Sequence, residues 1–384
     1  ITHFYISDFK EIAMTRIRNL YLVIFFCLFI FSAAAGIILL PKSDVSLLEK
    51  RSLSTAPEFS IENILNGKFE KQTETYTSDH FPFRAIWVSL DSYTRLYTGR
   101  NGTDGIYKGS DGYLINAPVS ADYDKLDKNL DAMISFSENS DIPSSMMIVP
   151  TAGYILDDKL PKNHLKYHDK ELISYAYKKS EKFIGIIDLI EPFLNQKNDS
   201  QLYYKTDHHW TTAGAYAAYL EYCKNIGFDE PLWDFNILRY KDFFGTAYSK
   251  SALWLEQGDV LEVWEYPIDV NVNIEDETIS DSLYFYEYLN KLDKYPIFLD
   301  GNHGIEKIVN NSNPNGEKLL VIKDSFAHCL VPFLINHYSE IDMIDTRYYL
   351  DPVSSLTQEN SYDRILYVFG LSSLCESSDI SILQ

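Results

Sequence analysis

The stretch Lys205-Thr206-Asp207-His208-His209-Trp210-Thr211-Thr212-Ala213-Gly214 is the most informative segment of this chain. It places an acid two residues before a histidine, and the threonines that follow are typical of a helix start. An acid that orients an imidazole forms one half of a hydrolytic triad, and the other half is a nucleophile. The stretch therefore predicts Asp207 as the orienting acid and His209 as the base.

A candidate nucleophile lies in Lys323-Asp324-Ser325-Phe326, directly after the apolar run Leu319-Leu320-Val321-Ile322. A serine hydroxyl is a weak nucleophile unless a base lies beside it, and the sequence already offers that base in His209. At a strand-to-helix turn, Ser325 would also lie near free N–H groups that can hold a developing oxyanion. We therefore predict Ser325 as the nucleophile.

Each motif also has a simpler interpretation. An Asp-x-His pair is often part of a polar loop, and a serine after a strand is often a helix cap. A metal site made of Asp207, His208 and His209 is a further alternative. We do not predict one, because adjacent histidine side chains diverge in an extended segment, where His208 would point away from His209.

The second half of the chain alternates between apolar runs and helical patterns. Strands are expected at 145–150, 183–188, 319–322, 341–345 and 364–370, and helices at 122–139, 170–182, 212–224 and after Ser325. This alternation predicts an α/β fold with a parallel sheet flanked by helices on both faces. Ligands of such folds bind at the carboxyl ends of the strands, so we expect Asp207, His209 and Ser325 to converge there.

Residues 231–300 depart from this alternation and are expected to form an insertion. They include Trp233, Trp254 and Trp264 and an acidic stretch at 273–281. We expect the insertion to cover the site, within a domain at 117–384.

Residues 20–40 contain no charged side chain. A helix of about 20 apolar residues is long enough to span a bilayer. Arg16 and Arg18 precede the run and predict a cytoplasmic N-terminus at 1–19, while 41–116 is expected to be a stalk and helical lead-in. A cleaved signal ending near Ala33-Ala34-Ala35 is the alternative. The apolar run continues past it, so we favour an uncleaved anchor, with residues 1–13 as an extension before Met14.

The composition narrows the possible partners. The chain has 384 residues, 46% of them hydrophobic, and a formal net charge of -21. Nucleic-acid binders need a basic surface, so the charge argues against that class.

With these motifs in view, nearly the whole chain resembles the bacterial DHHW family, whose name follows Asp207-His208-His209-Trp210. The resemblance also rests on these segments: Glu49-Lys50-Arg51, Asp79-His80-Phe81-Pro82-Phe83-Arg84, Val149-Pro150-Thr151, Phe244-Gly245-Thr246-Ala247-Tyr248 and Lys323-Asp324-Ser325-Phe326. The family is similar to the SGNH hydrolase superfamily and to the alginate O-acetylation proteins. The resemblance implies an SGNH-like sheet in which Asp207, His209 and Ser325 act as acid, base and nucleophile.

The order of the motifs implies a circular permutation. In SGNH enzymes the serine element comes first, whereas here 145–214 resembles the second half of the fold and 319–374 the first. The SGNH pattern also has an Asn as an oxyanion donor, which is missing after Gly370. Candidate oxyanion or substrate-binding residues are Asn302, Ser372, Arg347 and Trp210.

The resemblance implies an extracytoplasmic serine O-acyl transferase or esterase, acting on acetyl groups of a cell-envelope polysaccharide. A transferase would need a donor delivered across the membrane by a partner such as a membrane-bound O-acyltransferase. No cofactor or metal is expected. The alternative is a non-catalytic glycan-binding or envelope-assembly protein that keeps the fold.

Overall fold

The computed structural model describes residues 2–229, 233–274 and 277–383, with side chains from Met14 onward. Two compact units are present, residues 1–93 and 94–384. The boundaries predicted from the sequence stay predictions, because a division by contacts does not test the roles assigned to 1–19, 20–40, 41–116 and 117–384. Glu275 and Asp276, part of the predicted acidic stretch, lie outside the described residues.

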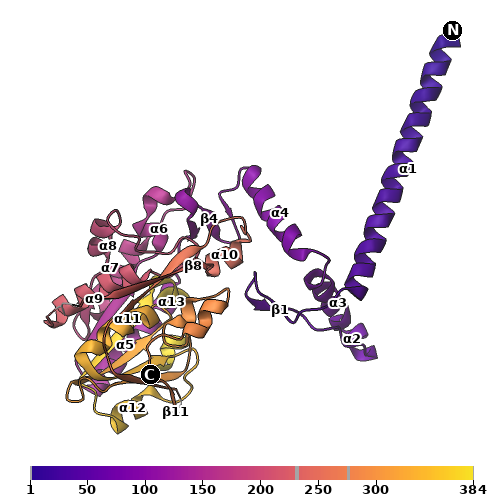
Figure 1. Cartoon of the computed structure of the whole chain (residues 1–384). Coiled ribbons are helices and arrows are strands. Elements are labelled where there is room, and N and C mark those ends of the chain that lie inside the picture. The colour runs from indigo at the N-terminus through magenta and orange to yellow at the C-terminus, as the bar shows by residue number, and fades with distance from the viewer. Residues whose placement is uncertain (1, 230–232, 275–276, 384) are drawn as a thin grey trace. The chain divides into compact units, whose positions relative to one another are not determined.

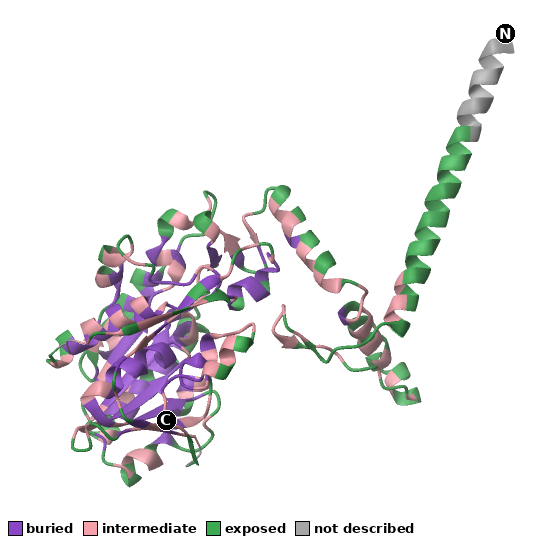
Figure 2. Cartoon of the chain, in the orientation of Figure 1, coloured by how far each residue is buried: buried purple, intermediate pink, exposed green. Residues whose placement is uncertain are grey.

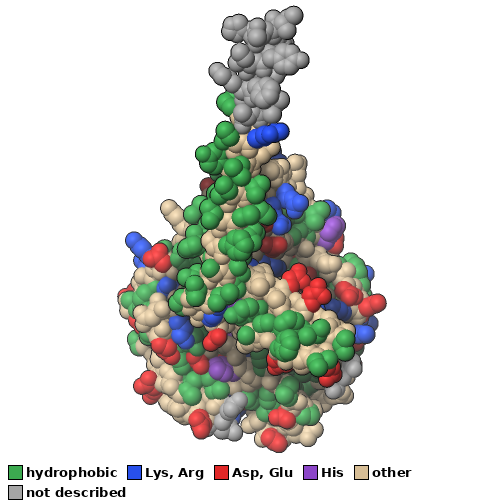
Figure 3. All heavy atoms as spheres, turned by 90° about the vertical axis from the view of Figure 1, so that its right-hand side faces the viewer, with side chains coloured by type: hydrophobic (Ala, Val, Ile, Leu, Met, Phe, Trp, Pro, Cys, Tyr) green, Lys and Arg blue, Asp and Glu red, His purple; other side chains and the backbone are tan. Residues whose placement is uncertain are grey.

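The first unit is built mainly of helices. Helix α1 (Thr2–Leu39) contains the stretch Met14–Leu39, which is long and apolar enough to cross a membrane. Figure 3 shows hydrophobic side chains covering this helix, and Figure 2 shows that its described part is largely exposed. It is followed by β1 (Val45–Ser46), β2 (Arg51–Ser52), α2 (Ile61–Leu65), α3 (Lys68–Asp79) and α4 (Arg84–Tyr97), whose last turn enters the second unit.

The second unit is organised around an eight-stranded sheet (Figure 1). Its parallel part contains, in spatial order, β14 (Tyr338–Asp345), β13 (Glu317–Lys323), β15 (Arg364–Gly370), β6 (Ser144–Val149) and β7 (Gly185–Ile187). The apolar runs of the sequence had predicted all of these strands. Because Lys323 is paired with Asp345 and Gly370 with Val149, the carboxyl ends of four strands meet at one edge.

The strand order confirms the circular permutation. If β13 is counted first, the parallel strands follow the spatial order 2-1-3-4-5, which is a common doubly wound arrangement. In this chain the strands that would come fourth and fifth, β6 and β7, instead come before the others. The spatial arrangement of the strand ends is unaffected by that exchange.

Helices cover both faces of the sheet. On one face, α9 (Thr212–Ile226) and α11 (Ala327–Leu334) pack against Leu319, Val321 and Met343. On the other face, α5 (Tyr123–Ser140), α7 (Asp169–Ser180) and α13 (Leu371–Glu376) pack against Leu320 and Ile322. Alternate residues of β13 therefore enter opposite cores, as a strand buried on both faces requires.

The prediction of a purely parallel sheet was incomplete. Strands β12 (Ile305–Asn310), β10 (Val270–Ile274) and β11 (Glu277–Ser280) extend the sheet beyond β14 in antiparallel order. The predicted insertion also holds the hairpin β8 (Asn236–Phe243) and β9 (Asp259–Glu265), with α10 (Thr246–Ser251) in its connection.

Shorter elements complete the second unit. The glycine-rich segment after α4 forms a small sheet of β3 (Gly102–Thr103), β4 (Ile106–Lys108) and β5 (Leu114–Asn116). The remaining helices are α6 (Ala152–Ile155), α8 (Ile190–Gln196) and α12 (Val353–Glu359), and 3-10 helix η4 (Tyr295–Ile297) lies in the insertion.

Candidate active site

The structure brings Asp207, His209 and Ser325 together in one hydrogen-bonded row. Nδ1 of His209 lies 2.5 Å from Oδ1 of Asp207, and Nε2 of His209 lies 2.7 Å from Oγ of Ser325. Asp207 and His209 are buried, whereas Ser325 is partly exposed. This order places a carboxylate on one ring nitrogen and a hydroxyl on the other, which is the arrangement that activates a serine.

The Asp207 carboxylate is anchored on both of its oxygens. Oδ1 accepts the His209 backbone N–H at 2.9 Å, and Oδ2 accepts the Thr246 N–H at 2.6 Å and the Thr246 hydroxyl at 3.1 Å. Gly245 permits this approach, because a Cβ there would lie 2.1 Å from the Asp207 Cβ. The segment Phe244–Tyr248, noted for its resemblance to the family, therefore holds the acid.

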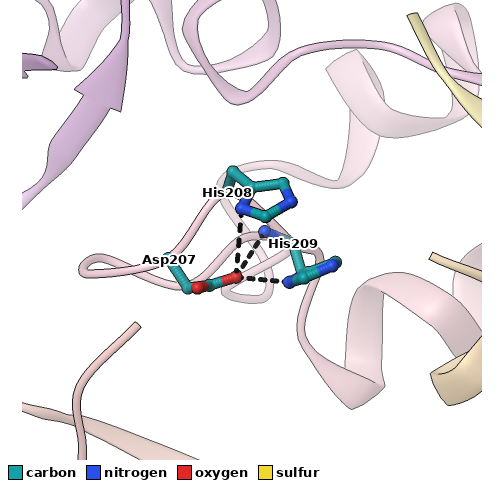
Figure 4. A group of neighbouring side chains, drawn as sticks. All are labelled: Asp207, His208 and His209. Atoms are coloured by element: carbon teal, nitrogen blue, oxygen red, sulfur yellow. Dashed lines mark hydrogen bonds and ion pairs between the residues drawn. The ribbon is translucent and has the colours of Figure 1, made fainter. Parts of the chain in front are cut away.

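His208 does not point away from His209, and the expectation that it would is wrong. The loop is not extended, and the two imidazole centroids lie 3.9 Å apart. His208 Nδ1 lies 2.7 Å from the Thr246 hydroxyl. The same nitrogen lies 3.6 Å from Asp207 Oδ1, as Figure 4 shows. His208 thus belongs to the group of side chains around the acid.

Asp207, His208 and His209 each offer a ligand atom, and these atoms lie within 4.8 Å of one another. The group is therefore the place where a metal ion could be sought among the described residues. However, the carboxylate contacts the His209 ring nitrogen directly at 2.5 Å, and that nitrogen would have to turn to an ion instead. The geometry fits a hydrogen-bonded pair better than a pair of zinc ligands, each about 2.0–2.2 Å from an ion.

A second buried carboxylate, Asp259 on β9, supports the loop before Asp207. It accepts the N–H groups of Lys205 and Thr206, each at 2.8 Å, and the Thr206 hydroxyl at 2.6 Å. Burial raises the pKa of Asp259, and these hydrogen bonds oppose that rise. No local signal in the sequence pointed to Asp259, because it lies more than fifty residues from the loop it holds.

Ser325 lies between the end of β13 and the start of α11, as predicted. The nearby N–H groups are not free, however. The Asp324 carboxylate accepts the N–H of Phe326 at 3.0 Å and that of Gly370 at 2.8 Å. The expectation of free helix-start donors is therefore wrong for Phe326, because the Phe326 N–H donates to the Asp324 carboxylate. The same carboxylate accepts the Gly370 N–H and so joins the ends of β13 and β15.

Tyr295 is a site residue that the sequence did not reveal. Its ring stacks on the His209 imidazole, with centroids 3.9 Å apart and an interplanar angle of 9°. Its hydroxyl donates to the backbone oxygen of Ser325 at 3.2 Å. Burial raises the pKa of Tyr295 well above its usual value, so the hydroxyl stays protonated. The insertion therefore does contribute to the site, through η4.

Trp210 is fully buried and does not line the site, which corrects its prediction as a substrate contact. Its indole N–H donates to the backbone oxygen of Phe326 at 3.1 Å, and its ring packs edge-on against the Phe326 ring. Trp210 therefore joins the histidine loop to the serine turn from inside the core.

A cavity of about 240 Å³ opens beside Asp207 and His208. Ser372, one of the predicted candidates, lines it together with Thr151, whose N–H and hydroxyl both donate to buried Asp169. The remaining lining includes Asn116, Lys250, Phe326 and Glu376. The cavity lies at the carboxyl ends of β6 and β15, where ligands of doubly wound folds bind.

Asn302 and Arg347 lie together, and Asp345 holds the arginine. Arg347 contacts both Asp345 oxygens, at 2.8 and 2.5 Å, and donates to Asn302 at 3.3 Å. The Asp345 carboxylate raises the pKa of Arg347. In the described part of the chain, neither side chain is hydrogen-bonded to His209 or Ser325, so their roles toward substrate stay predictions.

A buried polar cluster lies beneath α11. Lys323 Nζ lies 2.5 Å from His328 Nε2 and 3.5 Å from Asp345. Burial lowers the pKa of Lys323 and of His328. Glu306 is fully buried on β12, and burial raises its pKa to about 8. The sequence predicted none of these contacts.

Comparison with solved structures agrees with the fold. A DHHW family protein from Eubacterium siraeum is 22% identical, with a TM-score of 0.64 over 73% of this chain and 95% of its own. Bacillus cereus PatB1, in a structure with a sulfonyl adduct, is 23% identical, with a TM-score of 0.59 over 71% of this chain and 97% of its own. At these identities the likeness concerns the fold.

Among named relatives, the chain is similar to the probable alginate O-acetylase AlgJ of Pseudomonas syringae pv. tomato. The two are 27% identical over 53% of this chain and 51% of that protein. The corresponding protein of Pseudomonas putida is 25% identical over 40% of this chain and 42% of its own length. The chain thus spans about half the length of the curated relatives it matches.

The family described as DHHW protein matches residues 104–344, which include Asp207, His209 and Ser325. The match covers more than half of the chain, although less than the near-complete resemblance expected from the scattered motifs. The chain belongs to the DHHW family.

Proposed function

We propose that this chain is a membrane-anchored, extracytoplasmic enzyme that transfers or removes an O-acetyl group on a cell-envelope polysaccharide. The observation that carries the proposal is the row from Asp207 through His209 to Ser325, with contacts of 2.5 and 2.7 Å. The similarity to proteins named alginate O-acetylase supports acetyl as the acyl group and a polysaccharide as the acceptor.

In the first half-reaction, His209 Nε2 accepts the Ser325 proton while Oγ attacks the carbonyl carbon of the acyl donor. The tetrahedral intermediate then collapses, and the bond between the acyl carbon and the donor's leaving group breaks. His209 returns the proton to that leaving group, and an ester on Ser325 remains. Asp207 orients the ring and stabilises its positive charge.

In the second half-reaction, a sugar hydroxyl or a water molecule takes the place of the leaving group. The acceptor's oxygen attacks the serine ester while His209 accepts the acceptor's proton. The tetrahedral intermediate then collapses, the bond between the acyl carbon and Ser325 Oγ breaks, and His209 returns the proton to Oγ. A sugar acceptor gives an O-acetylated polysaccharide, and water gives free acetate. The choice between transferase and esterase therefore depends on which acceptor reaches the ester first.

The cavity beside Asp207 and His208 is the proposed place for the acyl group or the sugar. Ser372 offers a hydroxyl there, whereas the Thr151 hydroxyl already donates to Asp169. Ser372 is the favoured oxyanion donor because Asn302 is held at Arg347. The mechanism uses no cofactor and no metal. A transferase would receive its acetyl group from a membrane partner, such as a membrane-bound O-acyltransferase.

One observation favours a second function. The N–H groups of Phe326, which follows Ser325, and of Gly370, at the end of β15, both donate to Asp324. A site short of oxyanion donors fits a non-catalytic glycan-binding or envelope-assembly protein that keeps the fold. This alternative predicts polysaccharide binding without turnover.

The test compares the full chain with Ser325→Ala in hydrolysis of para-nitrophenyl acetate and in acetyl transfer to a polysaccharide. We expect Ser325→Ala to lose on the order of 10³-fold or more of the rate, and mass spectrometry to find acetyl on Ser325 of the wild type. Ser354→Ala, an exposed serine on α12, is the matched control. Equal turnover by wild type and Ser325→Ala would refute the assignment, and an inert wild type that binds polysaccharide would favour the second function.

A further inference from the structure

The stretch of α1 that is long and apolar enough to cross a membrane is longer than a bilayer is thick, and it includes Arg16 and Arg18. Met14–Leu39 has 26 residues, which is about 39 Å of helix at about 1.5 Å per residue. The hydrocarbon core of a bilayer is about 30 Å thick. The excess lies at the N-terminal end, where Arg16 and Arg18 precede the uncharged run 20–40, so a span that begins after them ends near Leu40.

The second half of α1 contacts residues 81–87, which lead into α4 and form its first turn. The Phe29 ring lies 6.5 Å from the Phe81 ring and 6.3 Å from the Trp87 ring, measured between centroids. Closer to the helix end, a Cβ on Gly36 would lie 2.5 Å from Cγ of Pro82. The close packing at Gly36 shows that the 81–87 segment lies directly against the helix.

The same segment exposes large apolar side chains. Phe83 is 72% exposed, Ile86 63% and Trp87 45%. Ile86 and Trp87 lie in the first turn of α4, and Phe83 directly precedes this helix. Phe83 also has a φ of 58°, a conformation that is rare for an aromatic residue, so the backbone holds this ring outward at a cost.

The position of Phe29 along α1 fixes the depth of this surface. Phe29 lies ten residues before Leu39, the last residue of the helix, which is about 15 Å along the axis. The first polar side chains beyond the helix are Lys42 and Ser43. A span that ends near them places Phe29, and with it the Trp87 and Phe81 rings, at the level of the acyl chains.

The nearby charges are paired within the unit. Arg84 contacts Glu49 at 2.9 Å, and Arg51 contacts Asp79 at 2.6 Å. The two acids and two bases balance each other, which lowers the cost of bringing this surface close to lipid. The segments Glu49–Arg51 and Asp79–Arg84, both noted for their resemblance to the family, thus meet around the contact with α1.

We infer that residues 81–87 form a collar embedded in the membrane leaflet on the catalytic-domain side, with Phe83, Ile86 and Trp87 in contact with lipid acyl chains. The inference rests on the proposed anchorage through α1. Lipid is the occupant because the collar packs against the span itself, so any bilayer that holds Phe29 also surrounds the collar. Tryptophan is moreover enriched at membrane interfaces.

Spin labels on the full chain in nanodiscs of phosphatidylglycerol and phosphatidylethanolamine test this inference. Labels are placed at Phe83→Cys and, separately, Ile86→Cys, each combined with Cys27→Ala. The wild-type Cys27, exposed within the span, provides the reference for a lipid position, and Glu74→Cys on the exposed face of α3 provides the reference for water. The other three cysteines are buried. Power saturation with oxygen and with a water-soluble nickel chelate reports the depth of each label.

We expect both collar labels to resemble Cys27, with high oxygen and low nickel accessibility. Labels that resemble Glu74→Cys would overturn the inference, and labels shielded from both reagents would overturn it in favour of a protein partner or a second copy. A Cys27 label that itself reports water would refute the anchorage as well. Acetyl ester turnover, measured on the same samples, is independent of all these outcomes and keeps the proposed enzyme activity separate.

Discussion

The Tyr295 ring lies flat on the His209 imidazole, with centroids 3.9 Å apart and planes 9° from parallel. The same tyrosine donates its hydroxyl to the Ser325 backbone oxygen. One residue of the insertion therefore contacts both the proposed base and the turn that carries the proposed nucleophile. It can hold these two elements in register and shield the imidazole from water.

We predict that Tyr295→Leu lowers kcat/KM for acetyl ester about 10- to 100-fold, mainly through kcat, because misplacement of the base by about 1 Å costs rates of this order. Tyr295→Phe keeps the stacked ring and loses one hydrogen bond, so it should stay within about threefold of wild type, since one such bond is worth about 1 kcal/mol. Steady-state kinetics on the two variants measure the difference.

The matched control is Tyr284→Leu, another buried tyrosine of the insertion. Its ring contacts that of Phe298, which in turn contacts Tyr295, with centroid separations of 6.1 and 5.5 Å. An equal loss of kcat in Tyr284→Leu would show that general packing, and not the ring on His209, explains the effect.

Gly245→Ala should reduce turnover about 100-fold or more while the protein still folds. A methyl group there would overlap the Asp207 side chain, since its carbon would lie 2.2 Å from Oδ2 and 2.1 Å from Cβ of that residue. The acid must then move and lose its contact with His209, and overpacking of this kind costs about 1–3 kcal/mol of stability. Gly185→Ala, where the nearest atom would be Ser145 Oγ at 3.3 Å, is the control. Activity in Gly245→Ala equal to that control would exclude a dependence on the Asp207 position.

The sequence was sufficient to predict the parallel sheet and the meeting of the three site residues. Continuous apolar runs mark strands that are buried on both faces, and β13 is one of them. Parallel strands place their carboxyl ends on one edge. Ser325 follows β13, and the Asp207 loop lies between α8 and α9, so both were expected near that edge without any knowledge of their contacts. For this reason the chain order of Asp207, His209 and Ser325 did not matter.

The surroundings of the row could not be predicted in the same way. Thr246, Asp259 and Tyr295 come from the insertion, whose strands are antiparallel or form a separate hairpin. Thr246 lies in a segment noted for its resemblance to the family, but nothing in the sequence indicated its contact with Asp207, and Asp259 and Tyr295 carry no local signature. His208 was misplaced because alternation of side chains holds only in extended backbone. The Phe326 N–H was misjudged because an aspartate one residue before the serine competes for it.

Glu306 should make the stability of the protein depend on pH. Its pKa is raised by burial to about 8, whereas the unfolded chain should show a value of about 4.3. Between these values the folded protein keeps a proton that the unfolded chain releases. Stability therefore falls as pH rises through this window, by up to about 1.4 kcal/mol per pH unit.

Glu306→Gln removes this titration, so the Tm of the variant relative to wild type should increase from pH 5 to pH 8. Thermal unfolding at several pH values measures the trend, and Glu277→Gln, an exposed glutamate on β11, serves as the control. A constant difference in Tm across this range would show that Glu306 has already lost its proton in the folded protein.

The last prediction separates the hydrogen-bonded row from a metal site made of the same residues. In the row, Asp207 contacts His209 directly at 2.5 Å, whereas His208 lies 3.6 Å from the acid and contacts the Thr246 hydroxyl. Removal of metal with a chelator should therefore leave acetyl ester turnover unchanged. The variant His208→Asn should keep activity within about tenfold of wild type. Asp207→Asn should lose on the order of 10³- to 10⁴-fold of the activity, because the imidazole is no longer held in the correct tautomer. A zinc site would behave differently, since loss of either His208 or the ion would abolish activity and added zinc would restore the chelated enzyme. Turnover is measured before dialysis against a chelator, after it, and after zinc is added back. Restoration of activity by zinc would identify Asp207, His208 and His209 as metal ligands and would refute their role in activating Ser325.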